Sequence, residues 1–157
     1  LKVQEDSPVL FFAKGTGSLN FERSVGIVGT RSATLYGKTA TRKIIEDLAI
    51  YQPAIISGLA YGIDIEAHRA ALAVGLPTIA VMGSPISQIY PAIHRKTAES
   101  ILESGLVMSE YAPGTKMSPG NFPARNRIIA SLSDALIVVE AAEKGGALIL
   151  SIIHIGR

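Results

Sequence analysis

Short apolar runs, separated by stretches of helical pattern, recur along this chain. Between the runs, apolar residues return at the spacing of one helical face, as Ala40, Ile44 and Leu48 do. Continuous apolar runs are typical of strands that are buried on both faces of a parallel sheet. We therefore predict strands, in alternation with helices, over residues 25–28, 54–57, 78–83, 105–109 and 135–139.

Capping signals indicate where the helices begin and end. Asp64 is a good N-cap for a helix over 65–74, and Gly75 lies just past the end of that helix. Asn121 can cap a further helix, which carries Pro123 in its first turn, where the missing N–H is harmless. The other helical patterns cover residues 38–50, residues from about 94 to 103, and a segment that begins at Ala147.

The alternation of strands and helices predicts an α/β fold that is doubly wound. Its sheet should be mainly parallel and should carry helices on both faces, in three layers (α/β/α). We expect a single domain over residues 1–157, with a short N-terminal extension over about residues 1–22 that holds an edge strand at 9–13. Because the chain stops at Arg157, where a further strand is expected, we also expect a C-terminal strand or segment to follow.

The composition narrows the class of protein. Hydrophobic residues make up 48% of the chain and charged residues 18%, yet no apolar run reaches the roughly 20 residues that span a bilayer. The absence of cysteine excludes disulfides and thiolate metal sites and fits a cytoplasmic protein. We expect no membrane partner, no metal and no cofactor. The net charge of +2 permits a nucleic-acid partner without arguing for one.

Candidate chemistry follows the strands. Ligands of open parallel sheets bind outside the carboxyl ends of the strands, where glycines let a phosphate approach the backbone. Arg31 adds a planar guanidinium that can grip a phosphate at two points. Thr30, Arg31 and Ser32 after Gly29 replace the three-glycine turn of a dinucleotide site. The predicted phosphate contacts after the strands are Gly29, Thr30, Arg31, Ser57, Gly58, Gly62, Gly145 and Gly146, although a plain tight turn explains the last two equally well.

Further polar candidates lie in the second half of the chain. Lys116 is carried by a loop with Pro-Gly pairs, and Arg125, Asn126 and Arg127 lie early in the helix that follows. Because successive helical residues do not share a face, at least one of these three points toward the protein body or a neighbouring site. We predict that all four residues contribute to binding a phosphate.

Asp64, His68 and Glu140 are predicted to be structural residues at the same place. Asp64 and His68 lie one helical turn apart, and a direct contact between them that fixes the loop is the favoured interpretation. An acid/base role stays open, because histidine titrates near neutral pH. Lys38, in contrast, fits a solvated helix face better than a site.

Familiar catalytic patterns are missing from the sequence. It contains no P-loop, no pair of histidines at helical spacing and no nucleophile elbow. We therefore predict no catalytic residue and interpret the hydroxyls, amides and arginines at the strand ends as a binding site.

Several motifs, in the same order, resemble the DNA-processing protein A family (DprA, also called Smf). They cover nearly the whole chain. The block around Arg125 to Ile129 and the block from Ser57 to His68 are the most specific. The full set is Gly29-Thr30-Arg31 with Tyr36-Gly37, Ser57-Gly58 to Asp64 with Ala67-His68, Tyr90-Pro91, Ser109-Glu110, Phe122 to Ala130, and Glu140-Ala141.

The resemblance implies a function. It implies an extended Rossmann-like domain that binds single-stranded DNA in a basic pocket, forms a homodimer, and helps to load the recombinase RecA onto DNA during natural transformation and homologous recombination. It places Arg31 in that pocket and Arg125 and Arg127 at or near it. The family's dimer and RecA surfaces lie largely toward the missing end, so dimerisation of this chain stays open. Tyr36, Tyr61 and Phe122 are the candidates for base stacking.

Two alternatives use the same edge of the sheet. One is an enzyme of the related nucleotide phosphoribohydrolase type, whose Pro-Gly-Gly-x-Gly-Thr motif compares with Lys144-Gly145-Gly146-Ala147-Leu148 in this chain. The proline, the third glycine and the threonine of that motif are absent here. The other alternative is a sensor that binds a nucleotide without turnover.

Overall fold

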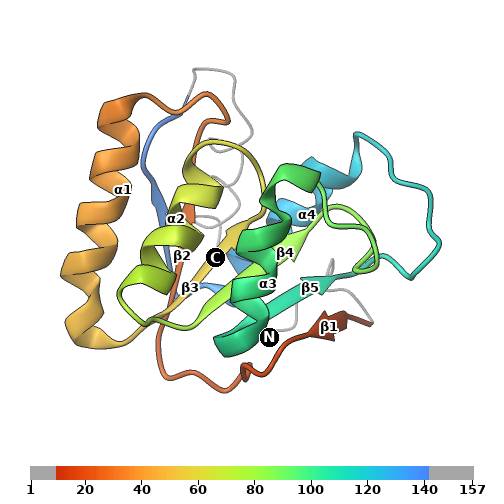
Figure 1. Ribbon diagram of the computed structural model, residues 1–157, viewed down its shortest axis with the longest axis horizontal. Coiled ribbons are helices and arrows are strands. Elements are labelled where there is room, and N and C mark those ends of the chain that lie inside the picture. Colours follow the sequence, from red (N-terminus) through yellow and green to blue (C-terminus); the bar gives the residue numbers. More distant parts are fainter. Residues whose placement is uncertain (1–9, 142–157) are drawn as a thin grey trace.

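A computed structural model describes residues 10–141, which form one six-stranded sheet (Figure 1). The strand order is β1-β5-β4-β3-β2-β6, and every neighbouring pair is parallel except β1 and β5. The predicted strands and the edge strand are confirmed to within a few residues. Their bounds are β1 Phe12–Lys14, β2 Ser24–Val28, β3 Ala54–Gly58, β4 Thr78–Met82, β5 Leu106–Ser109 and β6 Ala135–Val138.

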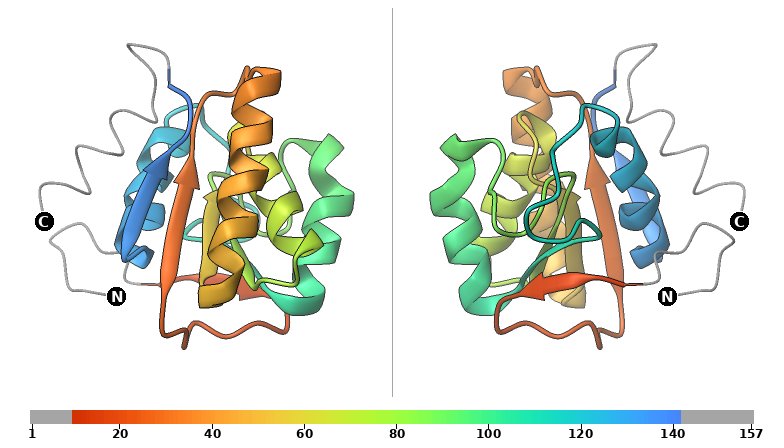
Figure 2. Two further views of the ribbon diagram at one scale, coloured as in Figure 1. Left: turned by 90° about the vertical axis from the view of Figure 1, so that its left-hand side faces the viewer. Right: turned by 90° about the vertical axis from the view of Figure 1, so that its right-hand side faces the viewer.

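The helices lie on both faces of the sheet, so the predicted three-layer arrangement is confirmed. Figure 2 shows α1, α2 and α3 on one face and α4 on the other. The α4 helix carries the chain from β5 across the sheet to β6, beyond β2. The helical bounds are α1 Leu35–Leu48, η1 Ala49–Tyr51, α2 Ile63–Ala73, η2 Ala92–His94, α3 Arg95–Ser104 and α4 Asn121–Leu132. None of the helices among these residues is both long and apolar enough to cross a membrane.

Each central strand supplies apolar side chains to both faces, which explains the continuous apolar runs. In β3, Ile55 packs with Ile27 and Ile45 beneath α1 and α2, whereas Ile56 packs with Ile128 beneath α4. All of these side chains are fully buried. Fully burying one such side chain contributes about 1.5–3 kcal/mol to folding.

Two of the predicted caps are wrong. The α2 helix begins at Ile63 and Asp64 lies inside its first turn, because the chain enters the helix through Gly62 at a φ of 78°. Asn121 is the first residue of α4 and makes no capping hydrogen bond. Thr34, which the sequence analysis did not predict as a cap, accepts a hydrogen bond from the Gly37 amide at 3.0 Å and starts α1. The helix expected from Ala147 lies outside the described residues.

Candidate functional site

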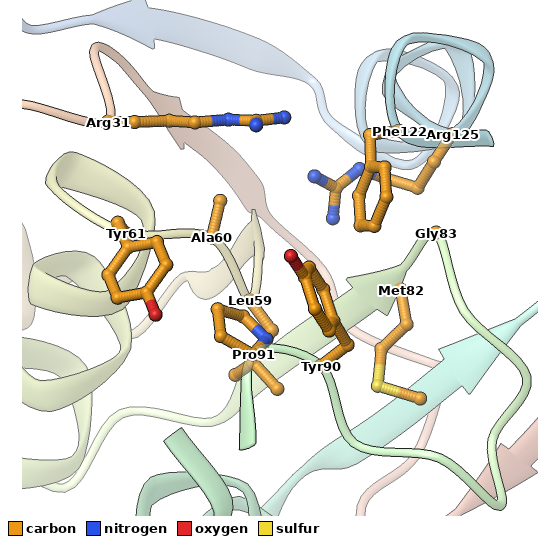
Figure 3. Close-up of a pocket in the computed structure, with 10 residues that line it drawn as sticks. All are labelled: Arg31, Leu59, Ala60, Tyr61, Met82, Gly83, Tyr90, Pro91, Phe122 and Arg125. Atoms are coloured by element: carbon orange, nitrogen blue, oxygen red, sulfur yellow. The ribbon is translucent and has the colours of Figure 1, made fainter. Parts of the chain in front are cut away.

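A pocket opens at the carboxyl edge of the sheet, where β3 and β4 end (Figure 3). Arg31 reaches it from the β2–α1 loop and Tyr61 from the β3–α2 loop. Tyr90 comes from the loop before η2, while Phe122 and Arg125 project from the first turns of α4. The topology therefore brings together four segments that are far apart in the sequence, as the sequence analysis predicted for this edge.

Arg31 is an exposed cation held over an aromatic ring. Its guanidinium carbon lies 5.7 Å from the ring centre of Phe122, a cation–π arrangement that contributes about 0.5–1 kcal/mol at exposed sites. The rings of Phe122 and Tyr90 are 5.4 Å apart, and the Tyr90 side chain is 43% exposed. The pocket thus combines a guanidinium with open hydrogen-bond donors and aromatic faces that a planar group can stack on.

Arg125 differs from Arg31 because it is buried, with only 4% of its surface exposed. Its Nη2 atom lies 3.8 Å from the Asp64 carboxylate, Nη1 donates to the Val81 carbonyl, and Nε donates to Asn126 Oδ1 at 3.2 Å. Burial lowers the pKa of this guanidinium, and the charge of Asp64 opposes that effect. Arg125 is therefore tied into the protein and forms one wall of the pocket.

The Asp64 carboxylate lies where an anion was expected. Burial raises its pKa, while Arg125, Arg31 and the backbone amides of Ala60 and Gly29 act in the opposite direction. Gly29, at the end of β2, is one of the predicted phosphate contacts, whereas Ala60, which follows β3, was not predicted. An internal carboxylate thus already supplies negative charge beside these backbone groups.

Gly58 is required by the same ion pair. A Cβ atom at this position would lie 2.3 Å from Arg125 Nη1 and 2.4 Å from Asp64 Oδ2, far inside contact distance. Gly62 has a similar packing reason, because its Cβ would lie 2.0 Å from the Thr30 carbonyl. The glycines after β3 therefore make room for protein groups.

Glu140 plays the corresponding part at the start of α1. Its Oε2 atom accepts from the Thr34 amide at 3.0 Å and from the Thr34 hydroxyl at 3.2 Å. A carboxylate at a helix N-terminus is stabilised by the unpaired amides and the helix dipole. A Cβ at Gly37 would lie 2.1 Å from the same oxygen. The anion site predicted before this helix is thus filled by Glu140.

His68 is fully buried and does not line the pocket. Its Nε2 atom lies 2.7 Å from the Gly58 carbonyl and its Nδ1 atom 2.7 Å from Thr78 Oγ1. Since a carbonyl only accepts, Nε2 carries the proton and donates to Gly58, while Nδ1 lies beside the Thr78 hydroxyl, which donates to the Ile55 carbonyl at 2.9 Å. The favoured Asp64–His68 contact is therefore not formed, because both ring nitrogens have other partners.

This burial makes the fold sensitive to acid. Burial lowers the pKa of His68 to about 4, from an ordinary value of 6.5. Below about pH 6.5 His68 becomes protonated in the unfolded chain, whereas in the folded chain it stays neutral down to about pH 4. The folded state therefore loses stability as the pH falls from about 6.5 toward 4. We expect the free energy of unfolding, measured with urea, to fall by about 2 kcal/mol between about pH 7.5 and pH 5.

The control for this prediction is His68→Gln, which has no titrating ring. The variant should be less stable than wild type at neutral pH and should lose less stability over the same pH range. Asp64, whose pKa is raised, offsets part of the loss at the acid end. A wild-type stability that stays constant across this range would contradict the assignment.

The remaining predicted residues lie outside the pocket. Arg127 forms an ion pair with Glu110, and Lys116 is exposed on the loop before α4. The Ser57 hydroxyl is buried and donates to the Ile27 carbonyl at 2.6 Å. The side-chain oxygen of Asn126 accepts a hydrogen bond from Arg125 Nε. Gly145 and Gly146 lie outside the described residues. Across residues 10–141, no group of three or more histidine and acidic side chains could hold a metal ion.

Tyr90 is the pocket residue that the sequence analysis missed as a stacking candidate. The only available signal was its place in the Tyr90-Pro91 pair, shortly after the third strand of the sequence. Tyr36, which was a candidate, is 82% exposed and lines neither this pocket nor a neighbouring hollow.

The sequence is similar to one family along almost its whole length. The family model described as DNA recombination-mediator protein A matches residues 1–153. Protein Smf of a Synechocystis strain is 47% identical over 154 residues, which cover 94% of this chain and 38% of the relative. DNA processing protein DprA of Streptococcus pneumoniae is 43% identical over 144 residues, covering 92% of this chain and 51% of the relative. The chain thus spans about half, or less, of the length of these two relatives.

Solved structures give the same result. DNA processing protein A from Streptococcus pneumoniae matches with a TM-score of 0.88 and 41% identity, over 95% of this chain and 52% of that one. The protein of the same name from Helicobacter pylori, described for its single-stranded DNA binding mode, matches with a TM-score of 0.87 and 33% identity. The match covers 96% of this chain and 69% of that one. A molybdenum cofactor binding protein from Rippkaea orientalis, at 15% identity and a TM-score of 0.62, shares the fold alone.

Proposed function

Because this chain belongs to the DNA recombination-mediator protein A family, also named DprA or Smf, we propose that it binds single-stranded DNA in the pocket beside Arg31. The placement of the exposed Arg31 guanidinium over Phe122, next to the open faces of Tyr90 and Tyr61, carries this proposal. The relative from Helicobacter pylori, which shares the fold, is described as a single-stranded DNA binder.

The two kinds of group in the pocket suit the two parts of a nucleotide. A base that stacks on Phe122 or a tyrosine ring contributes roughly 1–3 kcal/mol, and every base offers a flat face for this. The Arg31 fork suits a phosphate, which it can contact at two points. A single strand can turn its bases toward the protein, whereas the bases of a duplex are already stacked on one another.

We propose a wider role on the same basis. The bound strand would be passed to the recombinase RecA, in the cytoplasm, during DNA uptake by natural transformation and during homologous recombination, and the protein would act as a homodimer. The description of the family as recombination mediators supports this role. Because the chain spans only 38% and 51% of the two curated relatives, loading of RecA should be tested on the whole protein as well as on this chain.

Binding of labelled oligo-dT, followed by fluorescence anisotropy, tests the central proposal. We expect a duplex of equal length to bind roughly tenfold more weakly, since it forfeits at least one stacked base. The logarithm of the affinity should fall linearly with the logarithm of the salt concentration. The slope of this line should be about −0.7 for each phosphate contacted.

Equal affinity for the duplex, or an affinity that does not respond to salt, would contradict the proposal. Thymidine monophosphate is a useful competitor in the same assay. If it displaces oligo-dT as well as an unlabelled oligomer does, the nucleotide-sensor alternative is favoured. If purified protein releases free base from a nucleoside monophosphate, the enzyme alternative is favoured.

A further inference from the structure

A second hollow lies against the other side of Arg31 and Tyr61. We name it the α1–α2 groove and define it by Arg31, Lys38, Tyr61, Arg69 and Ile93, which line it from α1, α2 and the segments before α1, α2 and α3. Arg31 and Tyr61 also line the pocket, so the two hollows share a wall. Figure 3 shows these two side chains at one side of the pocket, and Figure 1 shows α1 and α2 side by side.

We propose that the α1–α2 groove holds the next nucleotides of the same DNA strand, with Lys38 and Arg69 on its phosphates. The inference rests on the proposed function, because it extends the bound strand from the pocket across Arg31 and Tyr61. It adds the path that the strand takes away from the pocket, toward α1 and α2. It also adds two cationic contacts, Lys38 of α1 and Arg69 of α2.

The charge of the groove favours an anion. Among the described residues, Arg31, Lys38 and Arg69 form no ion pair. The acidic side chain in the groove, Glu66, is paired with Arg42 at 2.5 Å. His94, which also lines the groove, is buried and hydrogen-bonds to the Leu59 carbonyl through Nδ1. The groove therefore presents three cations whose charge is not cancelled by a neighbouring carboxylate.

The groove also presents apolar surface that a base could cover. Ile93 is 72% exposed and Tyr61 is 49% exposed, so both side chains offer apolar surface to the groove. Cations beside open apolar faces suit a single strand, which offers phosphates and unstacked bases together. A duplex would meet the cations and leave the apolar faces in water.

The direction of the strand follows from the charges on the two sides of the pocket. On the α4 side, Arg127 is already paired with Glu110, and the exposed Lys116, on the loop before α4, lines neither hollow. On the α1 side, Lys38 and Arg69 are not neutralised in this way. Lys38, predicted on a solvated helix face, lines this open groove.

The double variant Lys38→Gln/Arg69→Gln tests the proposal. With oligo-dT of about 12 nucleotides, we expect the slope of log affinity against log salt to become shallower by about 1.4, because two phosphate contacts are lost. With a thymidine dinucleotide, which fills only the pocket, the affinity should stay within twofold of wild type. The charge-matched control is Arg23→Gln/Lys43→Gln, since Arg23 precedes β2 at the opposite edge and Lys43 is paired with Asp47. This control should keep the wild-type slope.

A second measurement uses the absence of cysteine from the chain. Arg69→Cys introduces a single thiol in the groove, and Lys43→Cys introduces one outside it. An oligo-dT with a disulfide tether should be trapped by Arg69→Cys several times faster than by Lys43→Cys.

The outcomes separate this inference from the function on which it rests. If the wild-type chain does not bind oligo-dT, the proposed function fails. If the wild-type chain binds, but Lys38→Gln/Arg69→Gln keeps the wild-type salt slope or both thiols are trapped at the same rate, the proposed path along the groove is overturned and the pocket stands.

Discussion

The substitution Arg31→Ala is expected to weaken binding of single-stranded DNA by about ten- to a hundredfold. Hydrogen bonds to a charged group contribute about 1.5–3 kcal/mol, and each 1.4 kcal/mol is a factor of ten in affinity. The effect is large because Arg31 supplies the free positive charge of the pocket. The other guanidinium in the pocket, that of Arg125, is buried against Asp64, and Arg127 is paired with Glu110.

Anisotropy titrations with oligo-dT at several salt concentrations measure this effect. The salt slope should become shallower by about 0.7 for each phosphate contact that Arg31 makes. Arg31→Lys should fall between alanine and wild type, because it keeps the charge but loses the planar fork. Arg23→Ala removes an exposed arginine at the opposite edge of the sheet and should bind like wild type. The melting temperature should fall by only a few degrees, since Arg31 is exposed and its cation–π contact contributes about 0.5–1 kcal/mol. Wild-type affinity in Arg31→Ala would remove this residue from the proposed site.

The layers of the fold could be predicted from sequence because burial on both faces leaves a simple pattern. Residues 54–58 supply Ile55 to one layer of helices and Ile56 to the other, so polar residues have no place between them. The position of the pocket could be predicted from topology, since the ends of parallel strands meet at one edge. Arg31 lines this pocket because it follows β2 at the same edge.

The partners of the polar residues could not be predicted, because they come from distant parts of the chain. Glu140 accepts from Thr34 across 106 positions of sequence, and Arg125 reaches the Val81 carbonyl across 44. No spacing rule connects such residues. A carboxylate one helical turn before a histidine suggests a local pair, yet Asp64 and His68 bond to different segments.

These internal carboxylates change how the site works. Amides and glycines at strand ends ordinarily favour a phosphate close to the backbone. Here the carboxylates of Asp64 and Glu140 already lie at the strand ends, so we expect an incoming strand to be held by side chains farther out. In the proposed function, exposed cations and aromatic rings form the binding surface. This explains why the pocket combines Arg31 with Phe122 and Tyr90 and does not contain a bare turn of glycines.

Breaking the buried Asp64–Arg125 ion pair is expected to lower the free energy of unfolding by about 3–5 kcal/mol. Asp64→Asn keeps the shape of the side chain, but it leaves the Arg125 guanidinium buried without its counter-charge. Arg125→Met leaves the carboxylate buried and removes the bond to the Val81 carbonyl. The double variant should lose clearly less than the sum of the two, because no unpaired charge remains.

Urea unfolding at neutral pH gives these values, and Asp47→Asn is the matched control. It breaks the exposed Lys43–Asp47 pair and should cost about 0.5 kcal/mol or less. The same variants distinguish the two roles that Arg125 could have. If Arg125→Met remains as stable as wild type but loses affinity for oligo-dT, then Arg125 contacts the DNA itself, as the sequence analysis predicted. The alternative outcome is that Arg125→Met is less stable than wild type, while its folded fraction, assayed at low temperature, still binds oligo-dT through Arg31. In that case Arg125 is a positioning residue that holds the ends of β3 and β4 in place.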